Sequence, residues 1–248
     1  MAGAQPGAGQ RLGILGGTFD PVHQGHLHVA RAAQTALSLD AVWLIPAAGP
    51  PHKPSQPRAP FADRLAMLEL AVTGEPGLVA CGIEAERPSP SYTIDLLAAL
   101  RGRLGPGPEL FFLLGADAFV EIGSWKAYAL LPAQAHLVVF PRPPVAPQEV
   151  EAAIAAVFPA FRRRSGESVW TAAGVPGRIR LLAGPPLAVS SSQVRQRISA
   201  GLPVSDLLPA AVAAHIVAHG LYLAHPALTL PPASGYGTGR PAGGDDEP

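Results

Sequence analysis

The sequence is poor in cysteine and has no long hydrophobic run. Cys81 is the only cysteine among 248 residues, so no disulfide can form within the chain, and we expect the protein in a reducing cytoplasm. No segment approaches the ~20 consecutive apolar residues that span a membrane, so we expect no membrane association. Residues 1–10 lack the basic region and apolar core of a secretory signal, and we expect a disordered leader there.

Neither sign of charge is in excess. The sequence has 18 Lys and Arg residues and 18 Asp and Glu residues, which gives a formal net charge of zero. The only lysines are Lys53 and Lys126, and the other basic side chains are arginines. Because no basic surplus creates a general attraction for polynucleotides, we expect no nucleic-acid partner.

Apolar runs and helical patterns alternate along most of the chain. Extended apolar runs occur at residues 11–15, 41–46, 78–83, 109–114, 135–140 and 178–182. Helical patterns occur at residues 25–39, 61–72, 91–103, 118–122, 149–158, 190–198 and 208–222. Ser91 or Thr93 could cap the third helix. The alternation predicts an α/β fold with a doubly wound parallel sheet, which binds ligands at the carboxyl ends of its strands.

The composition divides the chain into one domain and two tails. We expect a single domain over residues 11–225, and a disordered tail over residues 226–248, where few large apolar side chains occur. Within the domain, residues 141–178 include an insertion that the patterns leave unassigned. The arginines at 162–164 indicate an exposed loop, with a binding site as the alternative.

A glycine pair and two histidines lie between the first apolar run and the first helical pattern. Gly16 and Gly17 allow a ligand to approach the backbone closely, because glycine has no Cβ. The following helix start offers unpaired N–H groups and the positive end of the helix dipole, which favour phosphate. His23 and His26 lie at this helix start, where imidazole N–H groups can donate to phosphate oxygens. The segment predicts an anion site for a nucleotide phosphate.

Two other interpretations of the histidine pair remain open. A zinc site could use His23 and His26 with Asp20 as a third ligand, although Pro21 and Gly25 indicate a loop and not helical i, i+4 spacing. The histidines could also be ordinary surface residues after a glycine-rich turn. The sequence contains neither the P-loop pattern GxxxxGK[ST] nor the dinucleotide pattern GxGxxG, so we expect neither of those sites.

Five segments resemble motifs of one enzyme family. Residues 16–26 match the GGTFDPxHxGH signature of the nucleotidylyltransferase superfamily. Four more segments resemble motifs of the bacterial nicotinate-nucleotide adenylyltransferases: residues 44–53 (LIPAxxPPHK), 86–95 (ExxRxGxSYTxDTL), 115–125 (GADxxxxxxxW) and 190–195 (SSTxIR). The resemblance spans residues 11–223 and implies a Rossmann-like nucleotidylyltransferase fold with a C-terminal helical part.

The resemblance also implies a reaction. Members of this family join nicotinate mononucleotide to ATP, giving deamido-NAD and pyrophosphate in NAD biosynthesis. It implies that Mg²⁺ is bound with ATP and needs no protein ligand, and that the substrate phosphate displaces pyrophosphate in line, without a covalent intermediate. The alternatives are an adenylyltransferase that uses nicotinamide mononucleotide or another phosphate acceptor, and a non-catalytic nucleotide sensor on the same fold. A homo-oligomer also remains open.

The same resemblance assigns roles to individual residues. The implied catalytic side chains, which contact phosphate, are His23, His26, Lys53 and Arg195. The implied ATP-binding residues are Gly16, Gly17, Thr18, Phe19, Gly25, Gly115, Asp117, Ser191 and Ser192. The implied residues for the pyridine nucleotide are Asp20, Tyr92, Thr93 and Trp125.

Four of these residues have simpler structural roles as alternatives. Asp20 could be a turn residue that bonds its own backbone before Pro21. Asp117, expected to bind ribose hydroxyls, could be the N-cap of a short helix. Trp125, expected to stack on the pyridine ring, and Tyr92 could be ordinary core or surface aromatic residues.

Overall fold

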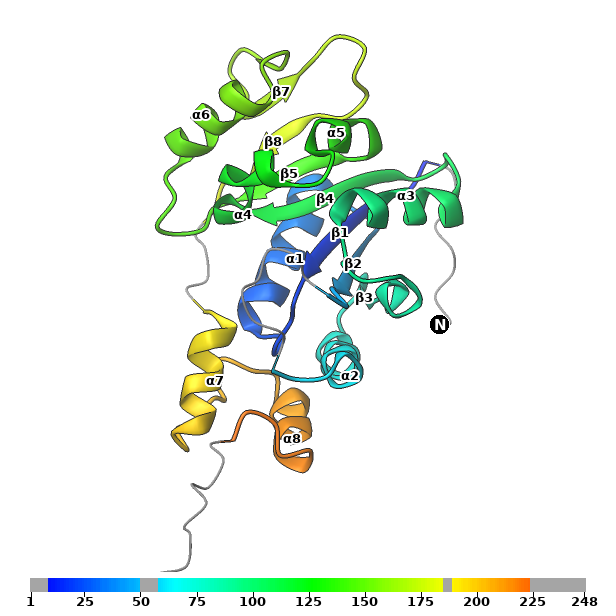
Figure 1. The fold of residues 1–248 in the computed structure, drawn as a ribbon. Helices are drawn as coiled ribbons and strands as arrows, with labels where there is room; N and C mark the ends of the chain where they lie inside the picture. The colour runs from blue at the N-terminus through cyan, green and yellow to red at the C-terminus, as the bar shows by residue number, and fades with distance from the viewer. Residues whose placement is uncertain (1–8, 50–57, 185–188, 224–248) are drawn as a thin grey trace, which may run out of the picture.

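A single eight-stranded sheet with helices on both faces organises the protein (Figure 1). The computed structural model describes residues 9–49, 58–184 and 189–223. The strands are β1 (Arg11–Gly17), β2 (Ala41–Pro46), β3 (Leu78–Ala80), β4 (Glu109–Gly115), β5 (His136–Phe140), β6 (Arg162–Arg163), β7 (Val169–Thr171) and β8 (Ile179–Leu181). Their order across the sheet is β3-β2-β1-β4-β5-β8-β7-β6.

Helices connect most of the strands and follow the last one. In the described residues, the α-helices are α1 (Gln24–Leu37), α2 (Phe61–Val72), α3 (Thr93–Leu104), α4 (Ala116–Val120), α5 (Leu131–Gln134), α6 (Pro147–Val157), α7 (Ser191–Ser199) and α8 (Ala210–Ala218). Short 3-10 helices are η1 (Ile83–Glu86), η2 (Ile122–Ser124) and η3 (Tyr128–Leu130). Within this part of the chain, no helix has both the length and the apolar character needed to cross a membrane.

The first five strands, together with β8, form the parallel part of the sheet. β1 pairs in parallel with both β2 and β4, β2 pairs with β3, and β4 pairs with β5. The strand order therefore runs outward in two directions from the β1–β4 pair, and the carboxyl ends of these two strands mark the usual ligand position. The prediction of a doubly wound α/β sheet is confirmed.

Successive side chains of the central strands alternate between two cores. In β4, Leu110, Phe112 and Leu114 belong to the core that includes α3, α4, α5 and α6. Phe111 and Leu113 belong to the core that includes α1, α2, α7 and α8. Burial on both faces explains why the sequence of β4 is a continuous apolar run. Residues of α7 and α8 pack in the same core as those of α1 and α2, and Figure 1 shows both helices in the lower part of the molecule, below α1. Ser191 and Tyr222 in this part of the chain bond to Pro21 and Asp20 of the loop after β1.

The segment left unassigned by the sequence contains α6 and a β-hairpin. The prediction of an exposed loop at residues 162–164 is wrong for Arg162 and Arg163, which form β6 and pair antiparallel with β7. All three arginines are exposed, and Arg164 lies between the two strands. β7 pairs antiparallel with β8, and β8 pairs in parallel with β5, so the hairpin extends the main sheet. Trp170 is buried, and the guanidinium of Arg163 lies 5.3 Å from its ring centroid. A two-residue strand with exposed side chains has no alternation by which periodicity could detect it.

Most helix ends differ by a few residues from those predicted, and the start of α3 and the end of α8 have identifiable reasons. Tyr92 is the N-cap of α3, so the prediction of a cap by Ser91 or Thr93 is wrong. α8 ends at Ala218, earlier than predicted, and Gly220 has a left-handed φ of 59° shortly after it. Such a residue cannot continue a right-handed helix, whatever the apolar pattern beyond it.

Both chain ends extend outside the described residues. Residues 1–8 and 224–248 are not described, so the division into a leader, one domain and a tail stays a prediction. The N–H of Gly9 donates to the carbonyl of Gly107 at 3.1 Å, which ties the chain to the loop before β4 from residue 9 onward.

Candidate active site

The loop after β1 leads from the glycine pair to the start of α1. β1 ends at Gly17, and Phe19 then adopts a left-handed φ of 50°, which is uncommon for a residue with a Cβ. The Phe19 ring is buried, and its centroid lies 4.8 Å from that of His26. A Cβ at Gly17 would come within 3.1 Å of the Phe19 ring. Gly17 therefore leaves room for the aromatic ring that packs against His26.

His23 and His26 stack on each other at the N-terminus of α1. Their ring centroids are 3.7 Å apart, with 27° between the ring planes. His23 is the N-cap, and its N–H donates to Nδ1 of His26, the third helical residue, at 3.2 Å. This bond is the reciprocal half of a capping box. Because Nδ1 of His26 accepts a hydrogen bond, the proton of the neutral ring lies on Nε2.

Gly25 is required by the position of the His23 ring. A Cβ at Gly25 would lie 3.0 Å from Nδ1 and 3.1 Å from Cε1 of His23, and 3.5 Å from the carbonyl oxygen of Val189. The first two distances are tighter than ordinary van der Waals contact, so any larger residue would push the imidazole away. The glycine between the two histidines is therefore a packing requirement of their arrangement.

Burial keeps His23 neutral. Its side chain is 4% exposed, and its Nδ1 has no hydrogen-bond partner among the described residues. Burial, and after it the positive charge of Arg142, lower the pKa of His23 from 6.5 to about 4. His23 is therefore uncharged near pH 7 and can offer a phosphate a hydrogen bond but no charge. The effect of Arg142 also places this residue, which belongs to none of the recognised motifs, near the histidine pair.

The buried His23 should make the protein less stable in acid. In the unfolded chain this histidine takes up a proton near pH 6.5, whereas in the folded chain it does so only near pH 4. Between these values the unfolded state binds more protons, so the free energy of unfolding should fall by up to about 3 kcal/mol as the pH drops. Urea unfolding of the wild type and of His23→Asn between pH 7 and pH 4 measures this loss. The variant should lose less stability, and parallel curves for the two proteins would contradict the assignment.

Asp20 is a buried anchor of the loop. It is 5% exposed, and its carboxylate accepts hydrogen bonds from the N–H groups of Arg58 and Ala59 at 2.9 and 3.0 Å. It also accepts a hydrogen bond from the hydroxyl of Tyr222 at 2.8 Å, and burial followed by this bond raises the pKa of Tyr222. Arg195 Nη1 lies 3.7 Å from the carboxylate and donates to the Asp20 carbonyl at 2.7 Å. These partners are distant in sequence, unlike the local turn bond considered as an alternative, and contact with substrate stays a prediction.

The serine-rich start of α7 is attached to the same loop. Ser190 caps the helix through its Oγ, which accepts a backbone N–H of the first turn at 3.2 Å. Ser191 Oγ donates to the carbonyl of Pro21 at 3.0 Å. Arg195 Nη2 donates to Ser192 Oγ at 3.1 Å. These contacts bring a segment from the end of the domain against the loop after β1.

Arg64 joins three segments beneath the site and was missed in the sequence. It lies on α2 and is 1% exposed, and burial lowers its pKa. Its Nε donates to the carbonyl of Ala59 at 3.2 Å, and its Nη1 donates to the carbonyls of Thr18 and Ala47 at 2.7 and 2.9 Å. The helical pattern suggested only an ordinary polar residue. The available signal was a cation in the first turn of a helix, a position that the helix dipole disfavours.

Asp117 lies in the first turn of α4, directly after β4. Gly115 is the N-cap of this helix, so the alternative of Asp117 as the N-cap is wrong. Asp117 Oδ2 lies 3.3 Å from Nε of Arg142, which follows β5. A Cβ at Gly115 would collide with Asp117 Oδ1, a buried oxygen without a hydrogen-bond partner in the described part of the chain. A buried carboxylate oxygen without a partner can accept a hydrogen bond from a ligand hydroxyl. The contact between Asp117 and ribose stays a prediction.

The residues expected at the pyridine end lie in and after α3. Thr93 is the first residue of α3, and Tyr92 precedes it. Lys126 Nζ lies 4.9 Å from the centroid of the Tyr92 ring. Trp125 is half-buried and meets the Phe112 ring edge-on, with 6.4 Å between the centroids. Both aromatic rings therefore have packing partners within the protein, and their stacking on a pyridine ring stays a prediction.

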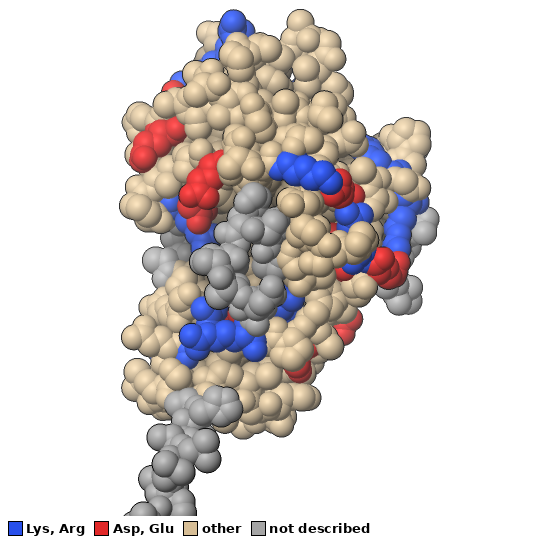
Figure 2. All heavy atoms as spheres, in the orientation of Figure 1, with Lys and Arg blue, Asp and Glu red and all other residues tan. Residues whose placement is uncertain are grey.

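The structure brings most of the implied ATP site together, but not all of it is described. The loop after β1 and the start of α7 bring together Gly16, Gly17, Thr18, Phe19, Asp20, His23, Gly25, His26, Ser191, Ser192 and Arg195. Lys53 lies outside the described residues, so its role stays a prediction. In the described residues, the one cluster of three possible metal ligands excludes the histidine pair, which gives the zinc alternative no support. Figure 2 shows basic and acidic side chains mixed over one face, with a group of basic ones in its lower half, level with α7.

Known proteins resemble the chain in sequence over most of its length. Residues 14–197 match the family described as cytidylyltransferase-like. A probable nicotinate-nucleotide adenylyltransferase of Pseudomonas fluorescens is 43% identical over 216 residues, which cover 87% of this chain and 99% of that protein. A protein of the same description from Xylella fastidiosa is 44% identical over 218 residues, which cover 86% of this chain and 96% of that protein.

Solved structures resemble the chain in fold. The nicotinic acid mononucleotide adenylyltransferase of Plasmodium falciparum, complexed with NaAD, has a TM-score of 0.65 and 19% identity to this chain. The match covers 86% of this chain and 97% of that one. It confirms the Rossmann-like nucleotidylyltransferase fold, while the sequence relatives identify the branch. The chain belongs to the nicotinate-nucleotide adenylyltransferase family, within the cytidylyltransferase-like proteins.

Proposed function

We propose that this protein transfers AMP from ATP to nicotinate mononucleotide, forming deamido-NAD and pyrophosphate in NAD biosynthesis. The observation that carries the proposal is the stacked His23–His26 pair at the N-terminus of α1, beside the β1–β4 pair from which the strand order diverges. Relatives that are 43% and 44% identical are named for this reaction, and a solved structure of similar fold is described as a complex with NaAD.

The chemistry depends on positioning and on neutralising charge. A 5′-phosphate oxygen of nicotinate mononucleotide attacks the α-phosphorus of ATP and forms a new P–O bond. The bond from the α-phosphorus to the bridging oxygen breaks, and pyrophosphate leaves with the electron pair. The attacking oxygen is already anionic, so neither a general base nor a covalent intermediate is required. Groups that contact the oxygens around the α-phosphorus lower the barrier.

We propose that His26 contacts the α-phosphate. Its Nδ1 accepts the N–H of His23, so a neutral His26 ring carries its proton on Nε2, and this N–H would donate to a phosphate oxygen in the complex with ATP. Neutral His23 adds a further donor. The N–H groups of Gln24 and His26 already donate to the carbonyls of Leu207 and His23, so the start of α1 would contribute mainly through the positive end of its dipole. Gly16, Gly17 and Thr18 would bring the triphosphate close to the backbone, because the glycines place no side chain between them.

Arginine and lysine side chains would surround the triphosphate with positive charge. The bonds of Arg195 to the Asp20 carbonyl and to Ser192 fix its guanidinium with two of its five N–H groups, and others can bind the β- and γ-phosphates. Arg142 lowers the pKa of His23 through its charge, so its field also acts at this end of the sheet. We propose that Lys53 places its charge over the transferred phosphate.

Mg²⁺ would enter on the phosphate oxygens of ATP, as part of that substrate. Asp20 is the carboxylate of the loop after β1, and its two oxygens already accept hydrogen bonds from two N–H groups and one hydroxyl. A carboxylate occupied in this way would have to give up buried partners to bind a cation. The occupied oxygens of Asp20 therefore fit a Mg²⁺ ion that is held by ATP and water without a protein ligand.

The pyridine nucleotide would lie toward α3. We propose that Trp125 stacks on the pyridine ring and that Thr93, with its neighbouring N–H groups, donates to the carboxylate. Thr93 is the first residue of α3, where unpaired N–H groups and the helix dipole favour an anion over a neutral amide. Asp117 would bind ribose hydroxyls, and Tyr92 would border the pyridine site.

Pyrophosphate release with different acceptors tests the proposed function. With ATP and Mg²⁺ present, nicotinate mononucleotide should give release about fivefold faster than nicotinamide mononucleotide, because a charge at a helix N-terminus contributes ~1 kcal/mol. Faster release with the amide would contradict the acid preference and favour the alternative acceptor. ATP binding without release for either acceptor would favour a non-catalytic sensor.

A further inference from the structure

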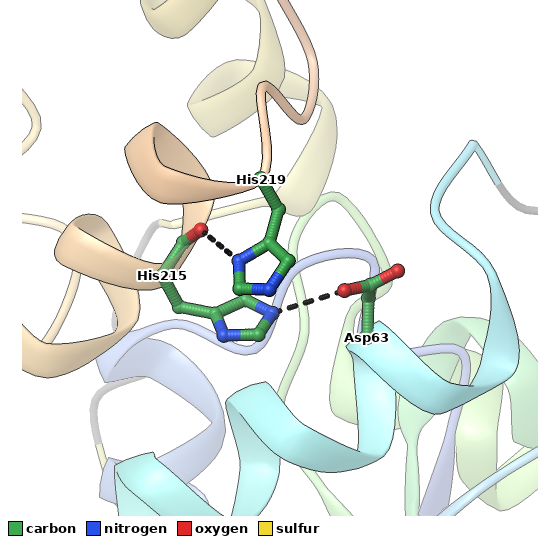
Figure 3. A group of neighbouring side chains, drawn as sticks. All are labelled: Asp63, His215 and His219. Carbon is green, nitrogen blue, oxygen red and sulfur yellow. Dashed lines mark hydrogen bonds and ion pairs between the residues drawn. The ribbon is translucent and has the colours of Figure 1, made fainter.

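Asp63, His215 and His219 form a cluster that the proposed reaction does not use. His215 lies in the last turn of α8 and His219 is its C-cap, so the two histidines share one side of the helix. Asp63 lies in the first turn of α2. One possible metal-binding atom from each residue lies within 4.8 Å of the other two. Figure 3 shows the two imidazole rings stacked against each other on the side of α8 that faces Asp63.

The hydrogen bonds of the cluster prepare two ring nitrogens for a metal ion. Nδ1 of His219 lies 2.9 Å from the carbonyl oxygen of His215 and must donate to it, so Nε2 of the neutral His219 ring carries a lone pair. Metal-binding histidines commonly donate their other N–H to a carbonyl in this way. Nε2 of His215 lies 3.1 Å from Oδ1 of Asp63. This distance is close to the ~3.3 Å between neighbouring ligands of tetrahedral zinc, so a metal ion could replace the proton between these two atoms with little movement of either side chain. The His219 ring, which is stacked on that of His215, would turn to direct Nε2 at the same ion.

The donor set and its exposure indicate the kind of ion. The side chains of His215 and Asp63 are 12% and 22% exposed, whereas His219 is exposed. Three protein ligands would therefore leave the solvent side for a water molecule as the fourth ligand. Two imidazoles and one carboxylate suit Zn²⁺ and similar transition-metal ions, whereas Mg²⁺ prefers oxygen ligands alone.

The cluster lies where two of the segments that hold Asp20 meet. The N–H groups of Arg58 and Ala59, just before α2, donate to the Asp20 carboxylate. Tyr222, which follows shortly after α8, donates to the same carboxylate. A link between the start of α2 and the end of α8 would therefore reduce the freedom of both segments.

We propose that Asp63, His215 and His219 bind one Zn²⁺ ion or a similar divalent transition-metal ion. The ion joins α8 to α2 and restrains the partners of Asp20. It is separate from the Mg²⁺ that accompanies ATP, and it takes no part in the chemical step.

Zinc binding by the full chain, after treatment with a chelator, tests the proposal. Equilibrium dialysis with metal analysis should find one Zn²⁺ per chain at this cluster, and Zn²⁺ at 100 times its Kd should raise Tm by about 5 °C. His219→Ala and Asp63→Asn should each weaken Zn²⁺ binding at least tenfold, as loss of a ligand commonly does. His219 is exposed and Asn retains the shape of Asp, so both variants should fold, which circular dichroism checks. His28→Ala is the control, because it removes a histidine of α1 outside the cluster.

The variants separate this site from other histidines. His28→Ala should bind Zn²⁺ as tightly as the wild type does. If His219→Ala and Asp63→Asn bind Zn²⁺ as tightly as the wild type, the metal lies elsewhere, for example at His23 and His26, and the proposal is overturned. A wild-type chain that binds no Zn²⁺ and shows no rise in Tm overturns it equally.

Discussion

Replacing His26 with alanine is expected to lower kcat for pyrophosphate release by about 100- to 1,000-fold. The Nε2–H of His26 is proposed to donate to an oxygen of the α-phosphorus, where negative charge grows in the transition state. Loss of one such donor costs about 3–4 kcal/mol of transition-state stabilisation in comparable sites. Initial rates at saturating ATP and nicotinate mononucleotide measure the effect, and KM should change less than kcat, because the contact strengthens mainly in the transition state.

Two matched variants separate this chemical role from the structural role of His26. His26→Asn places an amide near the position of Nδ1, where it can still accept the N–H of His23 and preserve the helix start. Loss of a capping bond costs ~1 kcal/mol of stability in His26→Ala, and His26→Asn should restore most of that stability. The kcat of His26→Asn should stay as low as that of His26→Ala. His28→Ala, two residues further along α1, should keep near-normal kcat. Retention of more than a third of kcat in His26→Ala would remove His26 from the mechanism.

Replacing Arg64 with methionine should lower the free energy of unfolding by about 3–5 kcal/mol. Methionine fills much of the same volume, but it leaves the buried carbonyl of Ala59 and the partly buried carbonyls of Thr18 and Ala47 without these donors. Each buried acceptor left unpaired costs about 1–3 kcal/mol, and the three lie in different segments that Arg64 joins. Urea denaturation measures the change, and KM for ATP should also rise, because Thr18 belongs to the loop after β1.

Arg103→Met is a matched control for this prediction. Arg103 lies on α3 and forms an exposed ion pair with Glu86. Exposed pairs contribute less than about 1 kcal/mol, so the same substitution there should have a small effect. If Arg64→Met is no more destabilising than Arg103→Met, water replaces the lost donors and Arg64 does not hold the three segments together.

The parallel strands could be predicted because each is a continuous apolar run in a buried position. The predicted bounds of Ala41–Pro46 and Phe61–Val72 agree with β2 and α2 in the structure. A buried strand carries its signal locally because its side chains face one core or the other, and α2 carries it as a helical spacing of its buried residues. β6 carries no such signal, because Arg162 and Arg163 are both exposed and the strand depends on its antiparallel partner.

The candidate site, like the fold, could be predicted from the sequence only where its signal is local. Sequence motifs located His23 and His26, because a helix start and two imidazoles follow one another in the chain. They did not reveal what holds the site in place. Arg64 resembled a residue of an ordinary amphipathic helix, and Arg142 belongs to no motif. The partners of Asp20 come from distant parts of the chain, and no periodicity relates residues so far apart.

Completion of the loop around Asp20 has a consequence for the newly made protein. Tyr222 is synthesised 202 residues after Asp20, which at bacterial rates of about 5–20 residues per second is a delay of about 10–40 s. β1 and β2 can pair on the ribosome well before that, since they are near neighbours in the chain. The nascent chain can therefore form much of its sheet early, yet its nucleotide loop gains the last of these bonds only after Tyr222 has been synthesised.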